Sequence, residues 1–276
     1  MYRLYSLFFL IFGWAIVVSC VKPYDAESFD FESVIVVDGL ITDELKTHQI
    51  KLHYTYPIGT SDDHPVEGAT VWVTHDEQQI DFSEQTPGIY KSEVPFSASE
   101  SEQYQLFFTT KEGEEFLSSP SSLTKSPPID SIYDRYAELA LDGSTSNLGG
   151  IQFFLDTHDP SGKAKYFRYE WEDQYKIITP VVSYYDYNRS TATYSWREKL
   201  NNICYAGHIS QSLLIGNTVG NSSDRLQEFP IRFVGGNTDV LRSRYTILVR
   251  QYAISEAAYS YYRKLKEKPG VWWIFV

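Results

Sequence analysis

Hydrophobic and polar residues alternate along much of the chain with the two-residue period of β-strands. The clearest case is residues 48–54, where one face would carry His48, Ile50, Leu52 and Tyr54. Other β-branched or aromatic runs predict strands at residues 33–37, 69–74, 88–90, 104–109 and 115–117. Asp38-Gly39 predicts a turn after the first of these runs. Short strands at near-regular spacing are typical of a β-sandwich, which we place at residues 33–119.

A Ser- and Pro-rich stretch then predicts a linker at residues 120–130. We assign residues 131–276 to a second β-rich domain. Its strands are expected at residues 132–138, 150–157, 166–178, 231–234 and 245–252. The polar, Tyr-rich residues 183–223 lie between these strands and have only weak periodicity.

One helix is expected near the C-terminus, at residues 255–268. Ser255 is a good N-cap, and an apolar stripe is formed by Ala258, Tyr261, Tyr262 and Leu265. The apolar residues 271–276 that follow predict either a last strand or a truncated C-terminus. The expected fold is therefore all-β, with an N-terminal transthyretin/Ig-like β-sandwich and a second β-rich domain that carries one C-terminal helix.

The first residues have the layout of an export signal. Arg3 precedes an uncharged apolar run that ends at Ser19-Cys20 and is short for a membrane-spanning helix. We predict a lipoprotein signal peptide at residues 1–19, lipidation of Cys20 and a polar tether at residues 20–32. A cleaved signal with a free Cys, or a short membrane anchor, remains the alternative.

The chain is acidic, with 36 Asp and Glu against 24 Lys and Arg. Nucleic acid is therefore not expected as a partner, because phosphate contacts need basic side chains. An acidic protein is also repelled by an anionic membrane surface. Membrane attachment would have to come from the N-terminal lipid.

No sequence motif for catalysis, metal binding or a cofactor is present, so the chain is not expected to be an enzyme. Asp156, His158 and Asp159 lie within four residues, but Asp-Pro-Ser-Gly at 159–162 favours a hairpin turn over a metal or catalytic site. Four histidines of the first domain match no zinc spacing and are expected to be scattered, either at the surface or half-buried: His48, His53, His64 and His75.

Aromatic residues are unusually frequent, with 22 Tyr, 16 Phe and 6 Trp. One cluster is a candidate ligand-binding surface and consists of Tyr184, Tyr185, Tyr187, Tyr194 and Trp196. Tyr and Trp supply large, rigid contact area at interfaces. The alternative is a Tyr-rich edge strand that packs on its own sheet.

Several segments together resemble a family of Bacteroidota outer-membrane lipoproteins, domain-of-unknown-function family 4249. They are VVDGLIT at 36–42, PVEGATVWV at 65–73, GIY at 88–90, PIDSI at 128–132, DPSG at 159–162, YFR at 166–168 and RYTILVRQYAISEAAY at 244–259. The first domain also resembles the transthyretin-like modules of that phylum's outer-membrane proteins.

The resemblance implies an outer-membrane location and an accessory role, because genes of similar proteins often lie beside those of TonB-dependent transporters. Similar proteins continue past the helix, and the resemblance implies that Cys204 pairs with a Cys in that continuation. We therefore expect a non-catalytic accessory or ligand-capture subunit, with an outer-membrane β-barrel transporter as partner. The alternatives are a stand-alone carbohydrate- or peptide-binding lipoprotein and, behind it, a hydrolase with an unrecognised site.

Overall fold

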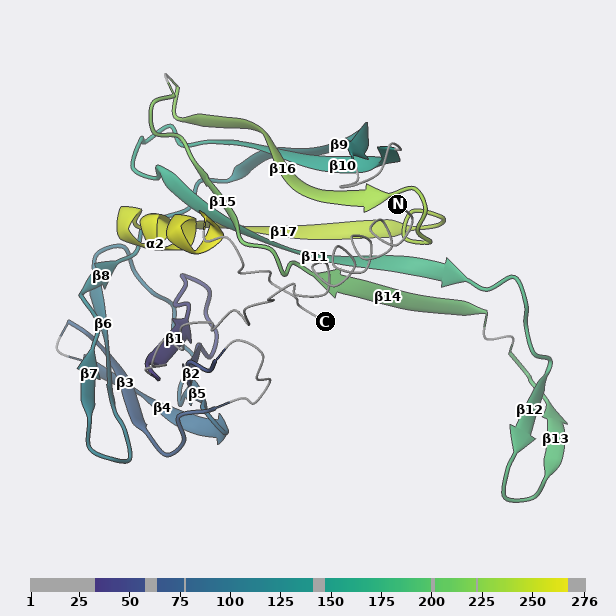
Figure 1. Cartoon of the computed structure of the whole chain (residues 1–276), viewed down its shortest axis with the longest axis horizontal. Helices are drawn as coiled ribbons and strands as arrows, with labels where there is room; N and C mark the ends of the chain where they lie inside the picture. The colour runs from purple at the N-terminus through teal and green to yellow at the C-terminus, as the bar shows by residue number, and fades with distance from the viewer. Residues whose placement is uncertain are drawn as a thin grey trace, which may run out of the picture.

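The structure is a computed structural model that describes residues 33–57, 64–76, 78–140, 147–199, 202–221 and 223–267. Almost all of its regular structure is β, and one helix, α2, lies near the C-terminal end (Figure 1). The expected all-β fold with a single C-terminal helix is confirmed. None of the helices in these residues has the length and apolar character needed to cross a bilayer.

The first part of the chain forms one eight-stranded sheet in the order β1-β2-β5-β4-β3-β6-β7, with β8 paired to β6. Its strands are β1 (Ile35–Gly39), β2 (Gln49–Tyr54), β3 (Thr70–His75), β4 (Gln78–Thr86), β5 (Ile89–Ser92), β6 (Gln103–Thr109), β7 (Glu115–Leu117) and β8 (Ser121–Ser122). Leu52 of β2 and Phe108 of β6 lie far apart in this order but share one hydrophobic core. The sheet must therefore curl around its own core, which gives a sandwich-like interior.

The alternation in β2 is confirmed, because Ile50 and Leu52 are buried on one face. Three details of the sequence analysis are wrong in this part. Asp38 and Gly39 form no turn, since both pair with β2 as the last residues of β1. His48 is not near the surface: it is 1% exposed, and its Nε2 lies 3.0 Å from the carbonyl oxygen of Phe96. The strand β4 was not predicted.

The second part contains two sheets. One has the order β16-β10-β9, and the other has β11 at its centre, with β14 and β15 on one side and β17 on the other. Their strands are β9 (Ile129–Ala140), β10 (Asn147–His158), β11 (Tyr166–Ile178), β14 (Ile203–Ile209), β15 (Leu214–Asn217), β16 (Arg225–Gly235) and β17 (Tyr245–Ala253). The two sheets share a core to which Leu155 of β10, Tyr169 of β11 and Ile231 of β16 belong.

The predicted linker contains strand residues at both ends. Ser121–Ser122 pair with β6, and β9 begins at Ile129. The division into domains stays a prediction. The Asp-Pro-Ser-Gly turn is not a hairpin turn, because β10 and β11 belong to different sheets and the turn carries the chain between them.

The helix α2 (Glu256–Glu267) begins as predicted, with the Ala258 N–H 3.1 Å from the Ser255 hydroxyl. It packs on β11 and β15, where Arg168 donates to the Tyr262 hydroxyl at 2.9 Å. Tyr261, expected in the apolar stripe, is 56% exposed. The half-buried Tyr259 instead accepts a hydrogen bond from Asn217 at 2.7 Å.

Candidate functional site

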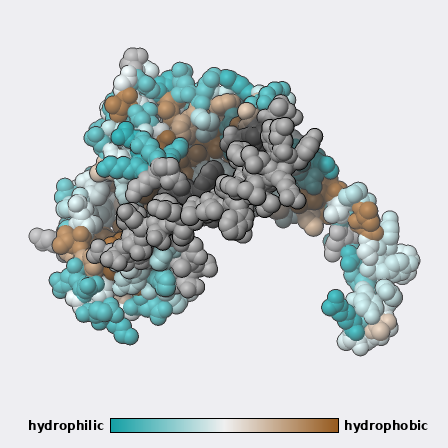
Figure 2. Space-filling model, viewed as in Figure 1, coloured by the Kyte–Doolittle hydropathy of each residue, from teal (hydrophilic) through white to brown (hydrophobic). Residues whose placement is uncertain are grey.

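Two places in the second part are candidates for function: an aromatic hairpin and a groove beside a buried polar cluster. The hairpin consists of β12 (Tyr185–Asn188) and β13 (Thr193–Trp196), which pair with each other and with no other described strand. It interrupts the connection between β11 and β14 and projects from the body of the molecule (Figures 1 and 2).

The structure brings the predicted aromatic residues together on this hairpin. Tyr185 lies against Trp196 with ring centroids 4.6 Å apart, and Tyr187 lies against Tyr194 at 4.9 Å. Tyr184 directly precedes β12, and its carbonyl oxygen accepts a hydrogen bond from the Arg197 N–H. All five are largely exposed, from 46% for Tyr185 to 72% for Tyr194. Because the hairpin belongs to no larger sheet in the described residues, the alternative of an edge strand packed on its sheet does not apply.

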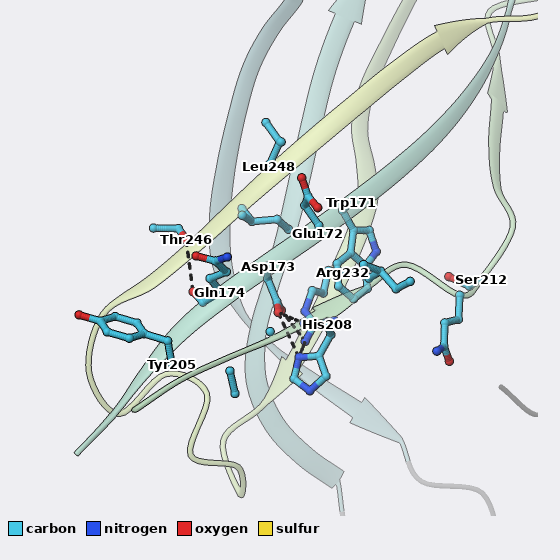
Figure 3. A pocket seen from close by; sticks show the side chains of 15 residues that line it. Trp171, Glu172, Asp173, Gln174, Tyr205, His208, Ser212, Arg232, Thr246 and Leu248 are labelled. Atoms are coloured by element: carbon cyan, nitrogen blue, oxygen red, sulfur yellow. Dashed lines mark hydrogen bonds and ion pairs between the residues drawn. The ribbon is translucent and has the colours of Figure 1, made fainter. Parts of the chain in front are cut away.

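The groove has a volume of about 1040 Å³ and lies along β11, β14 and β17. Its lining comes from both faces of this sheet. Asp173 and His208 lie on the inner face, toward the β16-β10-β9 sheet. Tyr205, Ile209 and Leu248 lie on the outer face. The cluster at the inner side of the groove centres on Asp173, whose side chain is fully buried (Figure 3).

Four donors satisfy the Asp173 carboxylate. The His208 backbone N–H and Nδ1 lie 2.8 and 3.0 Å from Oδ1. Arg232 Nη2 and the Tyr245 hydroxyl lie 2.7 and 3.1 Å from Oδ2. A buried carboxylate requires such partners, because an unpaired charge in the interior is costly.

Arg232 comes from β16, so its ion pair with Asp173 connects the two sheets. Its guanidinium also lies 3.9 Å from the centroid of the Trp171 ring, in a cation–π contact. Burial, with the nearby Asp173 carboxylate, raises the pKa of Tyr245, although Arg232 acts in the opposite direction. The phenol therefore stays protonated and donates its hydrogen bond.

His208 is the member of the cluster that reaches solvent, with its side chain 46% exposed. A carboxylate only accepts hydrogen bonds, so Nδ1 carries the proton that Asp173 accepts, and Nε2 is left to face outward. An imidazole held in this way can act as the base that activates a neighbouring nucleophile. In the described part of the chain, no hydroxyl or thiol is hydrogen-bonded to Nε2.

The residues that the sequence offered for metal binding have partners within the chain. Asp159 accepts hydrogen bonds from the backbone N–H groups of Ser161 and Ala164, which lowers its pKa against the effect of burial. His158 pairs with Asp130 at 2.7 Å. Among the residues that the structure describes, no three His, Cys, Asp or Glu side chains are grouped so that they could hold a metal ion.

The histidines of the first part do not converge. His75 Nδ1 lies 2.9 Å from a Glu102 carboxylate oxygen, while His48 is in the core. Cys20, the predicted lipidation site, lies outside the described residues, as do residues 1–19 and 271–276. Cys204 is an exposed free thiol on β14, and its pairing stays a prediction.

The sequence analysis missed the Asp173 cluster. Its signal was nevertheless present in the strand predicted at residues 166–178, where Phe167, Tyr169 and Trp171 occupy one face and Asp173 continues it. A carboxylate on a buried face indicates a partner elsewhere in the chain. Nothing in the sequence identified Arg232 as that partner.

Comparisons with known proteins give a family match. A family model described as domain of unknown function DUF4249 matches residues 21–270. Neither the curated proteins nor the solved structures gave a match.

Proposed function

Starting from the fact that the chain belongs to the DUF4249 family, we propose that it is a lipid-anchored outer-membrane protein of the Bacteroidota type. In this proposal it acts without catalysis, as an accessory or ligand-capture subunit of a TonB-dependent transporter. Lipid on Cys20 would hold it at the membrane, since two or more acyl chains give stable anchoring.

The observation that carries the proposal is the aromatic hairpin. It exposes Tyr187, Tyr194 and Trp196 on an arm that pairs with no other strand of the described chain and projects from the body of the molecule (Figure 1). A cluster of exposed aromatic side chains often marks an interaction site, and Trp and Tyr are enriched among the residues that contribute most to binding at protein interfaces. A two-stranded arm of this kind fits a contact with a partner protein better than a role in the core.

The test is co-purification from cross-linked, detergent-solubilised outer membranes. We expect a large β-barrel transporter, identified by mass spectrometry, to be recovered with the wild-type chain. Replacement of both Tyr194 and Trp196 by Ser should lower the recovery at least tenfold, because truncated interface aromatics commonly cost about 2 kcal/mol or more. Tyr136→Ser is the matched control, since Tyr136 of β9 is similarly exposed, at 68%, but lies outside the hairpin.

Two results would contradict the proposal in different ways. If no barrel is recovered with any variant, the accessory role fails. If the hairpin variant recovers the barrel as well as Tyr136→Ser does, the hairpin is not the contact.

The groove favours a second candidate, a stand-alone lipoprotein that binds carbohydrate or peptide. Its size, its aromatic residue Tyr205 and its polar residues His208 and Gln211 suit a ligand of that kind. Ligand binding by the purified chain in the absence of a barrel would favour this candidate.

A further inference from the structure

The edge strand β14 (Ile203–Ile209) has one side that pairs with no strand of the described chain. On its other side, the Ser210 N–H donates to the Trp171 carbonyl at 2.7 Å, and the His208 N–H points to Asp173. Backbone groups of alternate residues in an antiparallel strand point to opposite sides. The N–H and C=O groups of the odd-numbered residues therefore point away from β11; these residues are Ile203, Tyr205, Gly207 and Ile209.

This edge lacks the protection that the other long edge strands of the described chain have. Natural proteins discourage pairing at a sheet edge with charged side chains or Pro. Among the described edge strands of five or more residues, β1, β9, β16 and β17 each carry at least one such residue, for example Asp38, Arg135, Pro230 and Arg250. In β14, with the sequence ICYAGHI, there is no Lys, Arg, Asp, Glu or Pro.

The side chains beside the free edge are apolar and exposed. Ile203, Tyr205 and Ile209 are 48%, 68% and 66% exposed, and they share the outer face of the sheet with Leu248. The groove follows the same strand and reaches His208 on the inner face. A strand added to β14 would place alternate side chains next to Ile203, Tyr205 and Ile209 on the outer face, and the others on the inner face beside His208.

We propose that β14 binds an extended peptide segment of about seven residues by β-strand addition, with apolar side chains at alternate positions. The argument is one of chemical complementarity. A row of outward N–H and C=O groups is matched by another extended backbone, and the apolar side chains flanking it favour apolar residues in the added strand. The inference rests on the proposed ligand-capture role for its biological meaning but uses no residue of the hairpin.

The test uses the purified full-length chain in detergent and a random ten-residue peptide library displayed on phage. We expect selected peptides to alternate apolar and polar residues and to slow hydrogen exchange of the amides in residues 203–209. Tyr205→Pro removes an outward N–H and leaves the pairing with β11 intact, since Pro is tolerated where the N–H faces solvent. It should weaken the selected peptides about tenfold or more.

Tyr205→Ala is the matched control, because it removes the same ring but keeps the N–H. It should weaken binding much less than Tyr205→Pro does. If Tyr205→Pro does not fold, the double variant Ile203→Lys with Ile209→Lys places charges on the edge, as on the other edges, and should weaken the same peptides about tenfold.

Three results would overturn the inference: no enriched peptide, peptides that bind Tyr205→Pro as well as wild type, or a wild-type dimer in sedimentation that Tyr205→Pro converts to monomer. The last would show that a second copy covers the edge. Failure here is distinguishable from failure of the proposed function, because the hairpin variant should keep peptide binding and Tyr205→Pro should keep barrel recovery.

Discussion

Asp173 is the residue on which the packing of the two sheets depends most directly. Its fully buried carboxylate is 2.7 Å from Arg232 on the opposite sheet and holds His208 and Tyr245 on its own sheet. A buried ion pair adds little net stability compared with an apolar pair, but removal of one partner leaves the other charge uncompensated. The cluster therefore determines the relative orientation of the two sheets more than it adds to the free energy of their packing.

Replacement of Asp173 by Ala should lower the free energy of unfolding by about 3–5 kcal/mol, because Arg232 would remain buried against Trp171 without its counter-charge. The measurement is urea unfolding followed by circular dichroism. The matched control is Glu172→Ala, the next residue, whose pair with Arg250 at 3.0 Å is exposed and should contribute about 0–1 kcal/mol. Equal losses in the two variants would contradict the role given to Asp173.

His48 makes the stability of the first sheet depend on pH. Burial lowers its pKa below 6.5, although its hydrogen bond to the Phe96 carbonyl acts in the opposite direction. Of the nearby charges, Lys46 lowers this pKa and Glu44 raises it. Below pH 6.5 the unfolded chain therefore takes up a proton before the folded chain does, and stability is lost as the pH falls.

Urea unfolding at a series of pH values should show a loss of stability below about pH 6.5, with a slope of at most about 1.4 kcal/mol per pH unit from this group. His48→Gln has no titratable group, so its unfolding free energy should fall less steeply over the same range. Parallel pH profiles for wild type and His48→Gln would contradict this prediction.

At the level of elements, the sequence predicted several of the strands that bury one face, although it missed β4, which buries Ile80 and Phe82. The predicted residues 166–178 are the bounds of β11, because Phe167, Tyr169 and Trp171 alternate with polar residues. The helix was predicted to within a residue, since its cap and its apolar stripe agree.

Most of the strands that the sequence analysis missed lie in one stretch of the chain. The region 183–223 holds β12, β13, β14 and β15, of which β12, β13 and β14 bury no side chain. A strand with no buried face does not need alternating apolar and polar residues. A search for a two-residue period in hydrophobicity therefore does not detect it. The missed strands include β14, whose free edge is the basis of the peptide-binding proposal.

The aromatic hairpin and the Asp173 cluster also differ in how far they could be predicted from the sequence. The aromatic hairpin was visible in the sequence because its residues lie close together in the chain, within 184–196. The Asp173 cluster joins residues from β11, β14, β16 and β17, and 59 positions separate Asp173 from Arg232. Only the register of the strands brings these side chains together, and the register is not readable from a single sequence.

At the scale of the whole molecule, the first sheet and the aromatic hairpin lie at opposite ends, and the β11–β14 ladder extends between them (Figure 1). The connection from the first sheet to the rest runs through the Ser- and Pro-rich segment, which β17 holds in place. The Gln251 Nε2 of β17 donates to the Pro127 carbonyl at 2.8 Å and lies 3.2 and 3.3 Å from the hydroxyls of Ser126 and Thr157.

Gln251→Ala should therefore loosen this segment without unfolding either part. Lys125, which is exposed one residue before Ser126, supplies a trypsin site within it. Each lost hydrogen bond contributes about 1 kcal/mol, so local opening should become easier by about 1–2 kcal/mol and cleavage after Lys125 about tenfold faster. Mass spectrometry of timed trypsin digests measures this rate directly.

The matched control is Gln152→Ala, because Gln152 is also half-buried but its amide donates only to the carbonyl of the adjacent Phe153, at 2.9 Å. Its cleavage after Lys125 should keep the wild-type rate. If Gln251→Ala is also cleaved at that rate, the three contacts of Gln251 do not hold the connection. The first sheet would then be positioned by the contacts of α2 (Ala258 and Tyr262) and of Leu123 around the apolar crevice that they share with it.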